Sequence, residues 1–309
     1  MIKMKENIVP STKLKPFIKW AGGKSALLDE IRKFYPSKLG QDINKYCEPF
    51  VGAGAVLFDI LNSYNLKEIY ISDVNNELIN VWKTIQINVE PLIFILKKME
   101  DEYINLDDAK RKEYFYQKRK EFNKYILREI NDIVYGSALF IFLNRTCFNG
   151  LYRVNKDGLF NVPIGKYKNP KICDEDNLRN ISLKLKNVII SCSEYTESAY
   201  FIDQNTLVYF DPPYRPITKT ASFTSYSKFK FGDKQQIELA DYYTKSSNKG
   251  AMCILSNSDP KNNDNLDNFF DDLYKLFNIN RISTSRKINP NPDKRKSIVT
   301  ELLITNNFK

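Results

Sequence analysis

Asp211, Pro212, Pro213 and Tyr214 form a tetrapeptide whose residue types suit the binding of an amino group. It directly follows the apolar run 207–210, which predicts a buried strand, and open α/β sheets bind ligands at the carboxyl ends of their strands. Because a proline has no N–H, the two prolines leave only carbonyl acceptors beside the Asp211 carboxylate. Tyr214 adds a flat face on which a planar ring can stack. We predict a catalytic role for these four residues; a plain strand-ending turn is the less favoured alternative.

A second segment, from Glu48 to Gly54, has the composition of a nucleotide-binding turn. Its glycines allow close backbone approach, and Asp73 ends the next predicted strand, where an acid can accept hydrogen bonds from ribose hydroxyls. Leu57 stands where the dinucleotide fingerprint has its third glycine, which argues against a pyrophosphate ligand and for a nucleoside cofactor. A glycine turn without a ligand is the alternative, and Asp73 makes it the less favoured one.

Composition narrows the chemistry further. The 309 residues include no histidine, which excludes a Ser-His-Asp or Cys-His relay and any histidine-ligated metal. Five scattered cysteines without a C-x-x-C pair predict reduced thiols and no metal site. A net charge of +10 favours a polyanionic partner such as nucleic acid, or reflects solvated lysines. No signal peptide or membrane helix is predicted, so we expect a cytoplasmic protein without membrane contact.

Strands that alternate with helices are expected to position these motifs. The residues from 46 to 73 predict a strand, a glycine turn, a helix and a second strand, and further strands are predicted at 187–192, 206–210 and 251–255. A clear amphipathic helix is predicted at 235–243 and a weak one at 196–203. This alternation predicts an α/β fold with a doubly wound, largely parallel sheet.

Two segments depart from that alternation. Residues 77–99 and 107–143 predict two long helices, and thus an inserted, mainly helical domain. We expect a catalytic domain made of residues 1–75 and 174–309 and an inserted domain of residues 76–173. Toward the end of the chain, 277–283 and 297–305 predict a hairpin, and the acidic run 264–272 predicts a solvated helix face.

Five motifs together resemble the Dam-type DNA adenine methyltransferases, in the order seen in that family. They are Lys19 to Lys24, Glu48 to Gly54, Asn149 to Arg153, Phe160 to Tyr167, and Asp211 to Tyr214, and the resemblance extends from Pro16 to Asn306. It implies a Rossmann-like S-adenosylmethionine-dependent methyltransferase sheet with an inserted target-recognition domain that carries a DNA-reading hairpin. It also implies that a target adenine, flipped out of duplex DNA, receives a methyl group on its exocyclic amine.

The resemblance also implies roles for individual residues. The residues expected around S-adenosylmethionine are Trp20, Ala21, Lys24, Glu48, Phe50, Gly52, Gly54, Asp73, Glu194 and Tyr195; Asp73 is expected on the ribose, and Glu194-Tyr195 stands where the family usually has Asp-Phe near the cofactor adenine. Lys19, Leu151, Arg153 and Pro163 resemble the positions that read bases in GATC, and Phe148 and Asn149 resemble residues inserted near the target base. Lys166 replaces an arginine common at its position.

Other interpretations remain open at this stage. The same acceptor pocket suits an RNA or a protein-glutamine amine methyltransferase, and a catalytically silent DNA-binding protein is a third possibility. The basic runs 110–112, 118–120 and 286–287 suit either DNA phosphates or a solvated helix surface. A companion restriction endonuclease is a possible functional partner.

Overall fold

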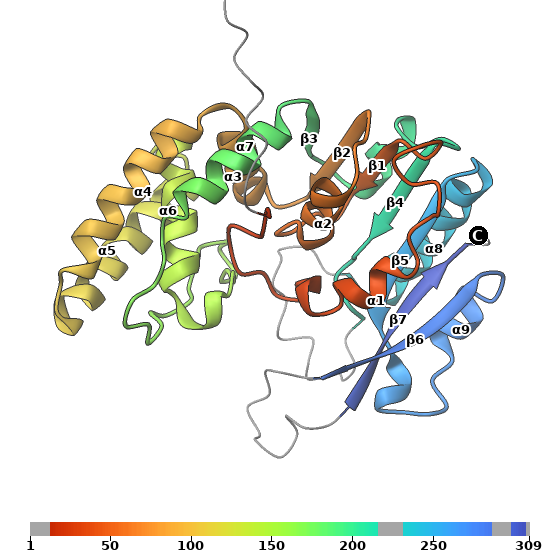
Figure 1. Cartoon of the computed structure of the whole chain (residues 1–309). Helices are drawn as coiled ribbons and strands as arrows, with labels where there is room; N and C mark the ends of the chain where they lie inside the picture. Colours follow the sequence, from red (N-terminus) through yellow and green to blue (C-terminus); the bar gives the residue numbers. More distant parts are fainter. Residues whose placement is uncertain (1–12, 216–230, 286–297, 307–309) are drawn as a thin grey trace, which may run out of the picture.

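Seven strands form a single sheet in the described part of the chain (Figure 1), which comprises residues 13–215, 231–285 and 298–306 of a computed structural model. The strands are β1 (Lys45–Glu48), β2 (Glu68–Asp73), β3 (Val188–Cys192), β4 (Thr206–Phe210), β5 (Met252–Ser258), β6 (Asn278–Ser285) and β7 (Ile298–Thr305). Their order across the sheet is β3-β2-β1-β4-β5-β7-β6. Strands β1 to β5 run parallel, whereas β7 is antiparallel to both of its neighbours. The predicted α/β fold with a largely parallel sheet is confirmed.

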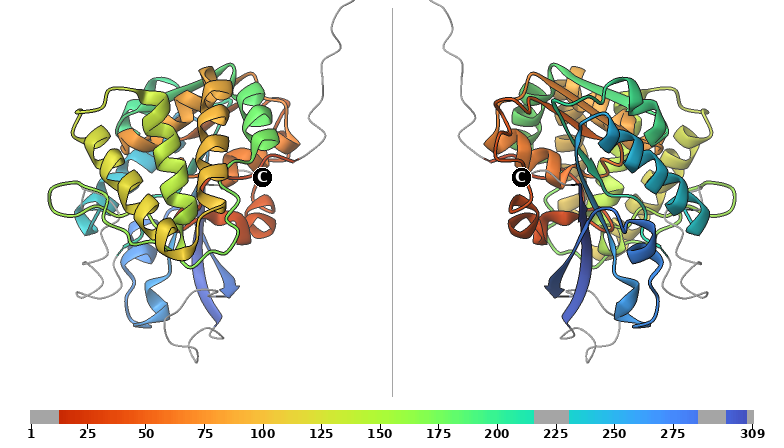
Figure 2. Two further views of the ribbon diagram at one scale, coloured as in Figure 1. Left: turned by 90° about the vertical axis from the view of Figure 1, so that its left-hand side faces the viewer. Right: turned by 90° about the vertical axis from the view of Figure 1, so that its right-hand side faces the viewer.

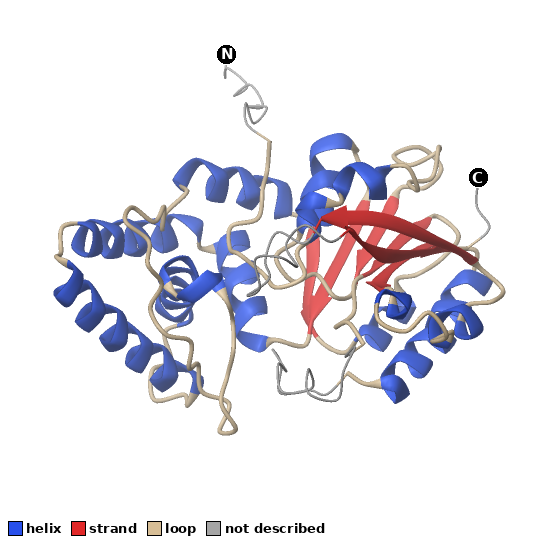
Figure 3. Ribbon diagram, turned by 90° about the horizontal axis from the view of Figure 1, so that it is seen from below, coloured by secondary structure: helices blue, strands red, loops and turns tan. Residues whose placement is uncertain are grey.

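Helices cover the sheet and also form a group beside it (Figure 3). The α-helices are α1 (Leu28–Arg32), α2 (Ala55–Ser63), α3 (Asn76–Ile87), α4 (Val89–Ile104), α5 (Asp108–Ile126), α6 (Ile133–Thr146), α7 (Glu175–Leu185), α8 (Asp233–Asn248) and α9 (Phe269–Leu273). The 3-10 helices are η1 (Lys24–Ala26), η2 (Phe148–Gly150), η3 (Tyr195–Tyr200) and η5 (Pro260–Asn262). Helices α4, α5 and α6 pack together, and α3 and α7 lie between them and the sheet (Figures 1 and 2).

The strand sequences build a hydrophobic core on each face of the sheet. Side chains alternate between the two faces of a strand, so neighbouring residues enter different cores. On β1, Tyr46 packs with residues of α2, α3 and α6, whereas Cys47 packs with residues of α8 and η3. On β4, Tyr209 belongs to the same core as Tyr46, and Val208 belongs to the same core as Cys47. This alternation places Glu48 and Asp211, each two residues beyond a tyrosine, on the α2 face.

The two long helices expected at 77–99 and 107–143 are each broken in two, so that prediction is wrong in its boundaries. Asn88 separates α3 from α4, and Pro91 then occupies the first turn of α4. A proline inside a continuous helix would remove one hydrogen bond and clash with the carbonyl four residues earlier, so the helix restarts instead. Asp132 begins α6, where its side chain accepts from the Tyr135 N–H at 2.9 Å.

Three smaller predictions have different outcomes. The weak helix at 196–203 is the 3-10 helix η3, and the hairpin at 277–283 and 297–305 is confirmed as β6 and β7, with Ser297 outside the described residues. The acidic run 264–272 is not a solvated helix face, because Asp267 and Asp271 form ion pairs with three basic side chains, Arg215, Lys261 and Arg281. Across the described ranges, no helix has both the length and the apolar character needed to cross a bilayer.

Candidate active site

The centre of the sheet brings the two predicted motifs together. Strands β1 and β4 are neighbours, and the chain continues from them in opposite directions, from β1 to β2 on one side and from β4 to β5 on the other. The crevice at the carboxyl ends of such a strand pair is where open α/β sheets bind ligands. Glu48 ends β1, and Asp211 follows the last residue of β4. Both carboxylates therefore lie at the same edge of the sheet.

The Asp211 carboxylate binds an ammonium group. Lys24 Nζ lies 2.7 Å from Asp211 Oδ1, and the side chains of Lys24 and Asp211 are 3% and 19% exposed. Ser256 Oγ donates to the same oxygen at 3.3 Å. Burial raises the pKa of Asp211, and the Lys24 charge opposes that rise. The resemblance places Lys24 beside the cofactor; in this structure its ammonium lies on the predicted catalytic carboxylate and 4.7 Å from the ring centre of Tyr214.

The two prolines of the motif differ in their surroundings. Gln236, on α8, donates from Nε2 to the Pro213 carbonyl at 3.0 Å. The side-chain oxygen of Gln236 in turn accepts from Asn257 Nδ2 at 3.1 Å, and both amide side chains are fully buried. Since the Pro213 carbonyl is already engaged, the carbonyl of Pro212 is the better placed of the two to accept from a ligand.

The Tyr214 ring is held by a residue of β7, which lies two strands away from β4 in the sheet. Its hydroxyl donates to Glu301 Oε2 on β7 at 2.6 Å. Burial raises the pKa of the Tyr214 hydroxyl, and the Asp211 and Glu301 charges add to that rise, so the phenol stays protonated and remains a donor.

The glycine turn after β1 is braced by Asp73 and by an indole ring. Asp73 accepts from the Gly52 N–H at 3.2 Å and from the Asn75 N–H at 2.9 Å. Trp82 Nε1 donates to the Gly52 carbonyl at 3.0 Å. Gly54 has a φ of +71°, and a Cβ there would lie 2.7 Å from the Trp82 ring. The turn therefore requires glycine at this position.

Aromatic side chains flank this turn. Phe50 stacks on Tyr195 with ring centres 5.3 Å apart. Trp20 stacks on Tyr152 at 5.8 Å, and a Cβ on Gly52 would lie 2.8 Å from the Trp20 ring. Of the other residues expected near the cofactor, Ala21 and Glu194 are exposed. The structure thus gathers the predicted cofactor residues around the carboxyl ends of β1 and β2 and the start of η3.

Glu48 is the most deeply buried carboxylate of this crevice, with 2% of its surface exposed. Tyr46 donates its hydroxyl to Glu48 Oε2 at 2.7 Å. Burial raises the pKa of Glu48 to about 8, although the Tyr46 hydrogen bond favours the charged form. With this raised pKa, Glu48 holds a proton at neutral pH, and a cationic group bound beside it would favour the charged form.

This raised pKa predicts how stability depends on pH. The folded state keeps a proton that the unfolded state loses above the ordinary glutamate value, so Glu48 lowers stability progressively from about pH 4.5 to about pH 8, by up to about 1.4 kcal/mol per pH unit. Glu48→Gln should remove that slope, so that its stability relative to wild type increases across this interval. Urea unfolding at several pH values measures it, with the exposed Glu68→Gln as the control. Parallel curves for wild type and Glu48→Gln would contradict the raised pKa.

The residues expected to read DNA also come together. The Phe148 N–H donates to the Pro163 carbonyl at 2.9 Å, and Lys19 Nζ donates to the Tyr167 hydroxyl at 3.1 Å. Asn144, buried on α6, joins the two parts: it bonds both backbone groups of Lys19 at 2.8 Å and the Gly150 carbonyl at 2.9 Å. Lys19, Phe148, Asn149, Arg153, Pro163 and Lys166 are exposed, and Leu151 is half-buried. Phe148 is 51% exposed, and Asn149 has a φ of +54°, uncommon outside glycine.

The basic runs on α5 are largely used within the protein. Arg111 donates to the carbonyls of Tyr103 and Lys168, and Lys118 pairs with Glu121. Arg119 lies over the Tyr116 ring. These contacts favour the interpretation of 110–112 and 118–120 as a helix surface with structural bonds, and Arg286 and Lys287 lie outside the described residues.

In the part of the chain that can be described, no group of three or more potential metal ligands occurs. All five cysteines are free thiols, and four of them are buried. The expectation of reduced thiols is consistent with this arrangement.

Known proteins match the chain over nearly its whole length. The family described as D12 class N6 adenine-specific DNA methyltransferase matches residues 20–288. The chain belongs to this family. It is therefore an enzyme of the adenine-specific DNA methyltransferase class, whose substrate is DNA and whose members generally use S-adenosylmethionine. The seven-stranded sheet is consistent with a Rossmann-like methyltransferase fold.

Three relatives of this D12 class enzyme cover almost all of it. The Type II methyltransferase M.MjaIII of Methanocaldococcus jannaschii is 50% identical, over 95% of this chain and 99% of its own. A DNA adenine methylase of Haemophilus influenzae is 36% identical, over 95% and 94%. The Type II methyltransferase M1.LlaDCHI of Lactococcus lactis subsp. cremoris is 35% identical, over 95% of both chains.

Three residues that contact the Asp211 to Tyr214 motif were missed from the sequence: Ser256, Gln236 and Glu301. Ser256 was detectable, because it follows the predicted strand 251–255 just as Asp211 follows its own strand. Glu301 gave a weaker signal, as the one charged residue in the otherwise uncharged run 298–305. Gln236 gave none, since a glutamine on an amphipathic helix is ordinarily a surface residue.

Proposed function

We propose that this protein transfers a methyl group from S-adenosylmethionine to the exocyclic amine of an adenine flipped out of duplex DNA, within the sequence GATC. The observation that carries this proposal is the Asp211 carboxylate at the β1 and β4 crevice, beside the Pro212 carbonyl and the Tyr214 ring. This carboxylate already binds an amino group, that of Lys24, at 2.7 Å. A site that binds an ammonium on its acceptor edge has the chemistry to bind an adenine amine there.

The crevice fits S-adenosylmethionine. Gly52 and Gly54 let the turn pack closely against the Trp20 and Trp82 rings, and the buried Glu48 carboxylate suits a cationic group. Asp73 suits the ribose, and the Phe50 and Tyr195 rings suit the adenine, with Trp20, Ala21, Lys24 and Glu194 at the margins of the site. When bound, the cofactor supplies an electrophilic methyl group on a sulfonium.

Asp211 and Pro212 would prepare the amine. The lone pair of the amine is delocalised into the adenine ring, so the planar amine is a poor nucleophile. Hydrogen bonds from its two hydrogens to the Asp211 carboxylate and the Pro212 carbonyl draw them out of the ring plane and localise the lone pair toward the methyl group. Tyr214 stacks on the flipped base and recovers part of the few kcal/mol lost in unstacking. Lys24 binds Oδ1 of Asp211, so the amine would bind a carboxylate that already carries this ammonium.

Residues 76–173 are proposed as the target-recognition domain, and residues 1–75 and 174–309 as the catalytic domain. The exposed residues Lys19, Phe148, Asn149, Arg153, Pro163 and Lys166, together with the half-buried Leu151, would contact the DNA. Lys19, Leu151, Arg153 and Pro163 would read bases. Because Asn144 bonds both Lys19 and Gly150, the reading residues of the two segments are held in one unit. A cytoplasmic location and a companion restriction endonuclease belong to the same proposal; two of the relatives carry the name Type II methyltransferase.

Methylation mapping tests the proposal directly. DNA of random sequence is incubated with the protein and S-adenosylmethionine, and modified positions are sequenced. N6-methyladenine confined to GATC is the expected result. Methylated adenine in another sequence would refute GATC alone, and transfer to RNA or to a protein glutamine instead would refute the DNA substrate. No transfer, together with no S-adenosylmethionine binding by calorimetry, would favour a catalytically silent DNA-binding protein.

Arg153 gives a specific prediction about base reading. It is exposed and its Nε donates to Asn161 Oδ1 at 2.8 Å, which leaves its terminal nitrogens for a guanine. Arg153→Ala should lose roughly 1–3 kcal/mol of discrimination at one base pair. Methylation rates on the cognate duplex and on single-substituted duplexes measure this, with the exposed Lys156→Ala from the same loop as the control. An equal loss on every duplex would make Arg153 a phosphate contact.

A further inference from the structure

Glu301 is the residue through which β7, two strands away from β4 in the sheet, reaches the active site. Its Oε2 accepts the Tyr214 hydroxyl at 2.6 Å. In β7 it precedes Leu302 and Leu303, both fully buried, and it is the one charged residue of the run 298–305. A tyrosine ring can turn about two side-chain bonds, so an acceptor at the hydroxyl is what selects one ring direction.

The register of β7 decides whether Glu301 faces Tyr214. Successive residues of a strand point to opposite faces, so a shift of one residue would turn Glu301 away and bring Thr300 or Leu302 into its place. The pairing of β5 with β7 ends at Ser258 opposite Glu301. Glu301 is therefore at the last position that the ladder between these two strands secures.

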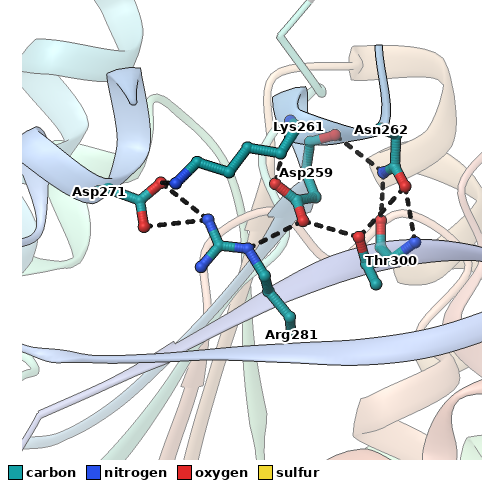
Figure 4. A network of polar contacts seen from close by, with 6 residues as sticks. All are labelled: Asp259, Lys261, Asn262, Asp271, Arg281 and Thr300. Atoms are coloured by element: carbon teal, nitrogen blue, oxygen red, sulfur yellow. Dashed lines mark hydrogen bonds and ion pairs between the residues drawn. The ribbon is translucent and has the colours of Figure 1, made fainter. Parts of the chain in front are cut away.

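Beyond Glu301, β7 still pairs with β6 as far as Ile298. On its other side, where β5 has ended, a cluster of polar side chains binds β7 instead (Figure 4). Asn262 acts as a substitute strand partner for Thr300: its Nδ2 donates to the Thr300 carbonyl at 2.7 Å and its Oδ1 accepts the Thr300 N–H at 2.9 Å. The Thr300 hydroxyl donates to Asp259 Oδ2 at 2.7 Å. All three polar groups of Thr300 are thus engaged, and they fix the residue next to Glu301.

Asp259 is itself held in place by charge. It is 1% exposed, and Arg281 of β6 donates from Nε to its Oδ2 at 3.0 Å. Arg281 and Lys261 also pair with Asp271, at 2.7 and 3.1 Å (Figure 4). The cluster therefore joins η5, β6, β7 and α9 around a single residue of β7, and none of its six members touches the Asp211 to Tyr214 motif in the described contacts.

We propose that Glu301 is a positioning residue for Tyr214, and that the cluster of Asp259, Asn262 and Thr300 fixes β7 next to Glu301 on the side that β5 leaves unpaired. The inference rests on the proposed function, in which the target base stacks on Tyr214. A ring that is free to turn still offers a hydrophobic face, but the base on it is not held against Asp211. Loss of the Glu301 contact is therefore expected to lower kcat more than it raises KM.

A double-mutant cycle tests the inference. Glu301→Ala should lower kcat about tenfold or more, and Glu301→Gln should recover most of it, because the amide oxygen still accepts from the tyrosine. Tyr214→Phe, which keeps the ring and removes the hydroxyl, should lose a similar factor. Adding Glu301→Ala to Tyr214→Phe should then cost nothing further. Multiplicative losses, full activity of Glu301→Ala, or no recovery with Glu301→Gln would overturn the inference.

Two further measurements separate this inference from the proposed function. Urea unfolding of the same four proteins reports the coupling between Glu301 and the Tyr214 hydroxyl without any substrate. Coupling in stability with no DNA methylation by wild type would refute the proposed function alone, whereas absence of coupling would refute the inference. Fluorescence of 2-aminopurine at the target position should be altered in Glu301→Ala relative to wild type, because the base on Tyr214 is held differently.

The cluster is tested by Asn262→Ala, with the exposed neighbour Asn263→Ala as its control. Asn262→Ala should lower kcat several-fold, and Asn263→Ala should leave it unchanged. Equal rates for the two variants would contradict a role for the cluster in holding β7 beside Glu301.

Discussion

Asp211→Ala is expected to lower the rate of methyl transfer by about 10³-fold or more while S-adenosylmethionine still binds. In the proposed reaction the carboxylate both orients the target amine and stabilises the charge that develops on it, and removing one such group typically costs 10²–10⁴-fold. Of the residues proposed around the cofactor, Lys24 contacts Asp211, whereas Gly52, Gly54 and Asp73 do not, so affinity measured by calorimetry should change far less than the rate. Single-turnover methylation of a duplex gives the rate.

Two controls accompany Asp211→Ala. The variant leaves the buried Lys24 ammonium without its carboxylate, so urea unfolding must establish that the protein is folded at the assay temperature. Asp241→Ala, at an exposed site on α8, removes a carboxylate from elsewhere and should keep its full rate. Turnover of Asp211→Ala close to that of wild type would refute the proposed role of this residue.

Gly54→Ala is expected to be the most destabilising of these single changes, by about 3 kcal/mol or more. Its φ of +71° costs an alanine about 1–2 kcal/mol, and the new Cβ would lie 2.7 Å from the Trp82 ring. That ring cannot move aside, because Trp82 is fully buried and its Nε1 donates to the Gly52 carbonyl. Overpacking of such a core commonly adds 1–3 kcal/mol.

Gly40→Ala separates the cost of a positive φ from the cost of overpacking against Trp82. Gly40 has a φ of +83°, but the nearest atom to a Cβ there is 3.5 Å away, so only the backbone cost applies. Urea unfolding should therefore show a loss of about 1–2 kcal/mol for Gly40→Ala and a clearly larger loss for Gly54→Ala. Equal losses would mean that Trp82 yields, and that the close approach of the turn to this ring is not what requires glycine.

The local pattern of the sequence predicted the elements well and their contacts poorly. Each strand from β1 to β5 was predicted close to its observed position, because a short apolar run between turns is a local signal. The break at Asn88 was not predicted, although Pro91, three residues later, is a local signal for a helix boundary. The order of the strands depends on which helices and loops cross which face of the sheet, and that is not a property of any single segment.

The site shows the same division. Asp211, Glu48 and Asp73 were placed at strand ends by local reasoning, and the structure places them at the same edge. The Lys24 contact with Asp211 and the Glu301 contact with Tyr214 join distant segments, and no spacing in the sequence reports them. Likewise, the sequence alone left Arg111 and Lys118 as residues that either contact DNA phosphates or face solvent. Their bonds within the protein are seen only in the structure.

The position of β7 between β5 and β6 has a consequence for folding. During synthesis β6 emerges before β7, yet β6 has no partner until β7 enters between it and β5. The pairing of β1 with β4 likewise waits for the whole helical insertion to be made. Such non-local pairing slows folding. A chain caught at this stage would already carry Asp211 and the glycine turn but would lack Glu301 at Tyr214, so activity should lag behind the appearance of the parallel strands during refolding.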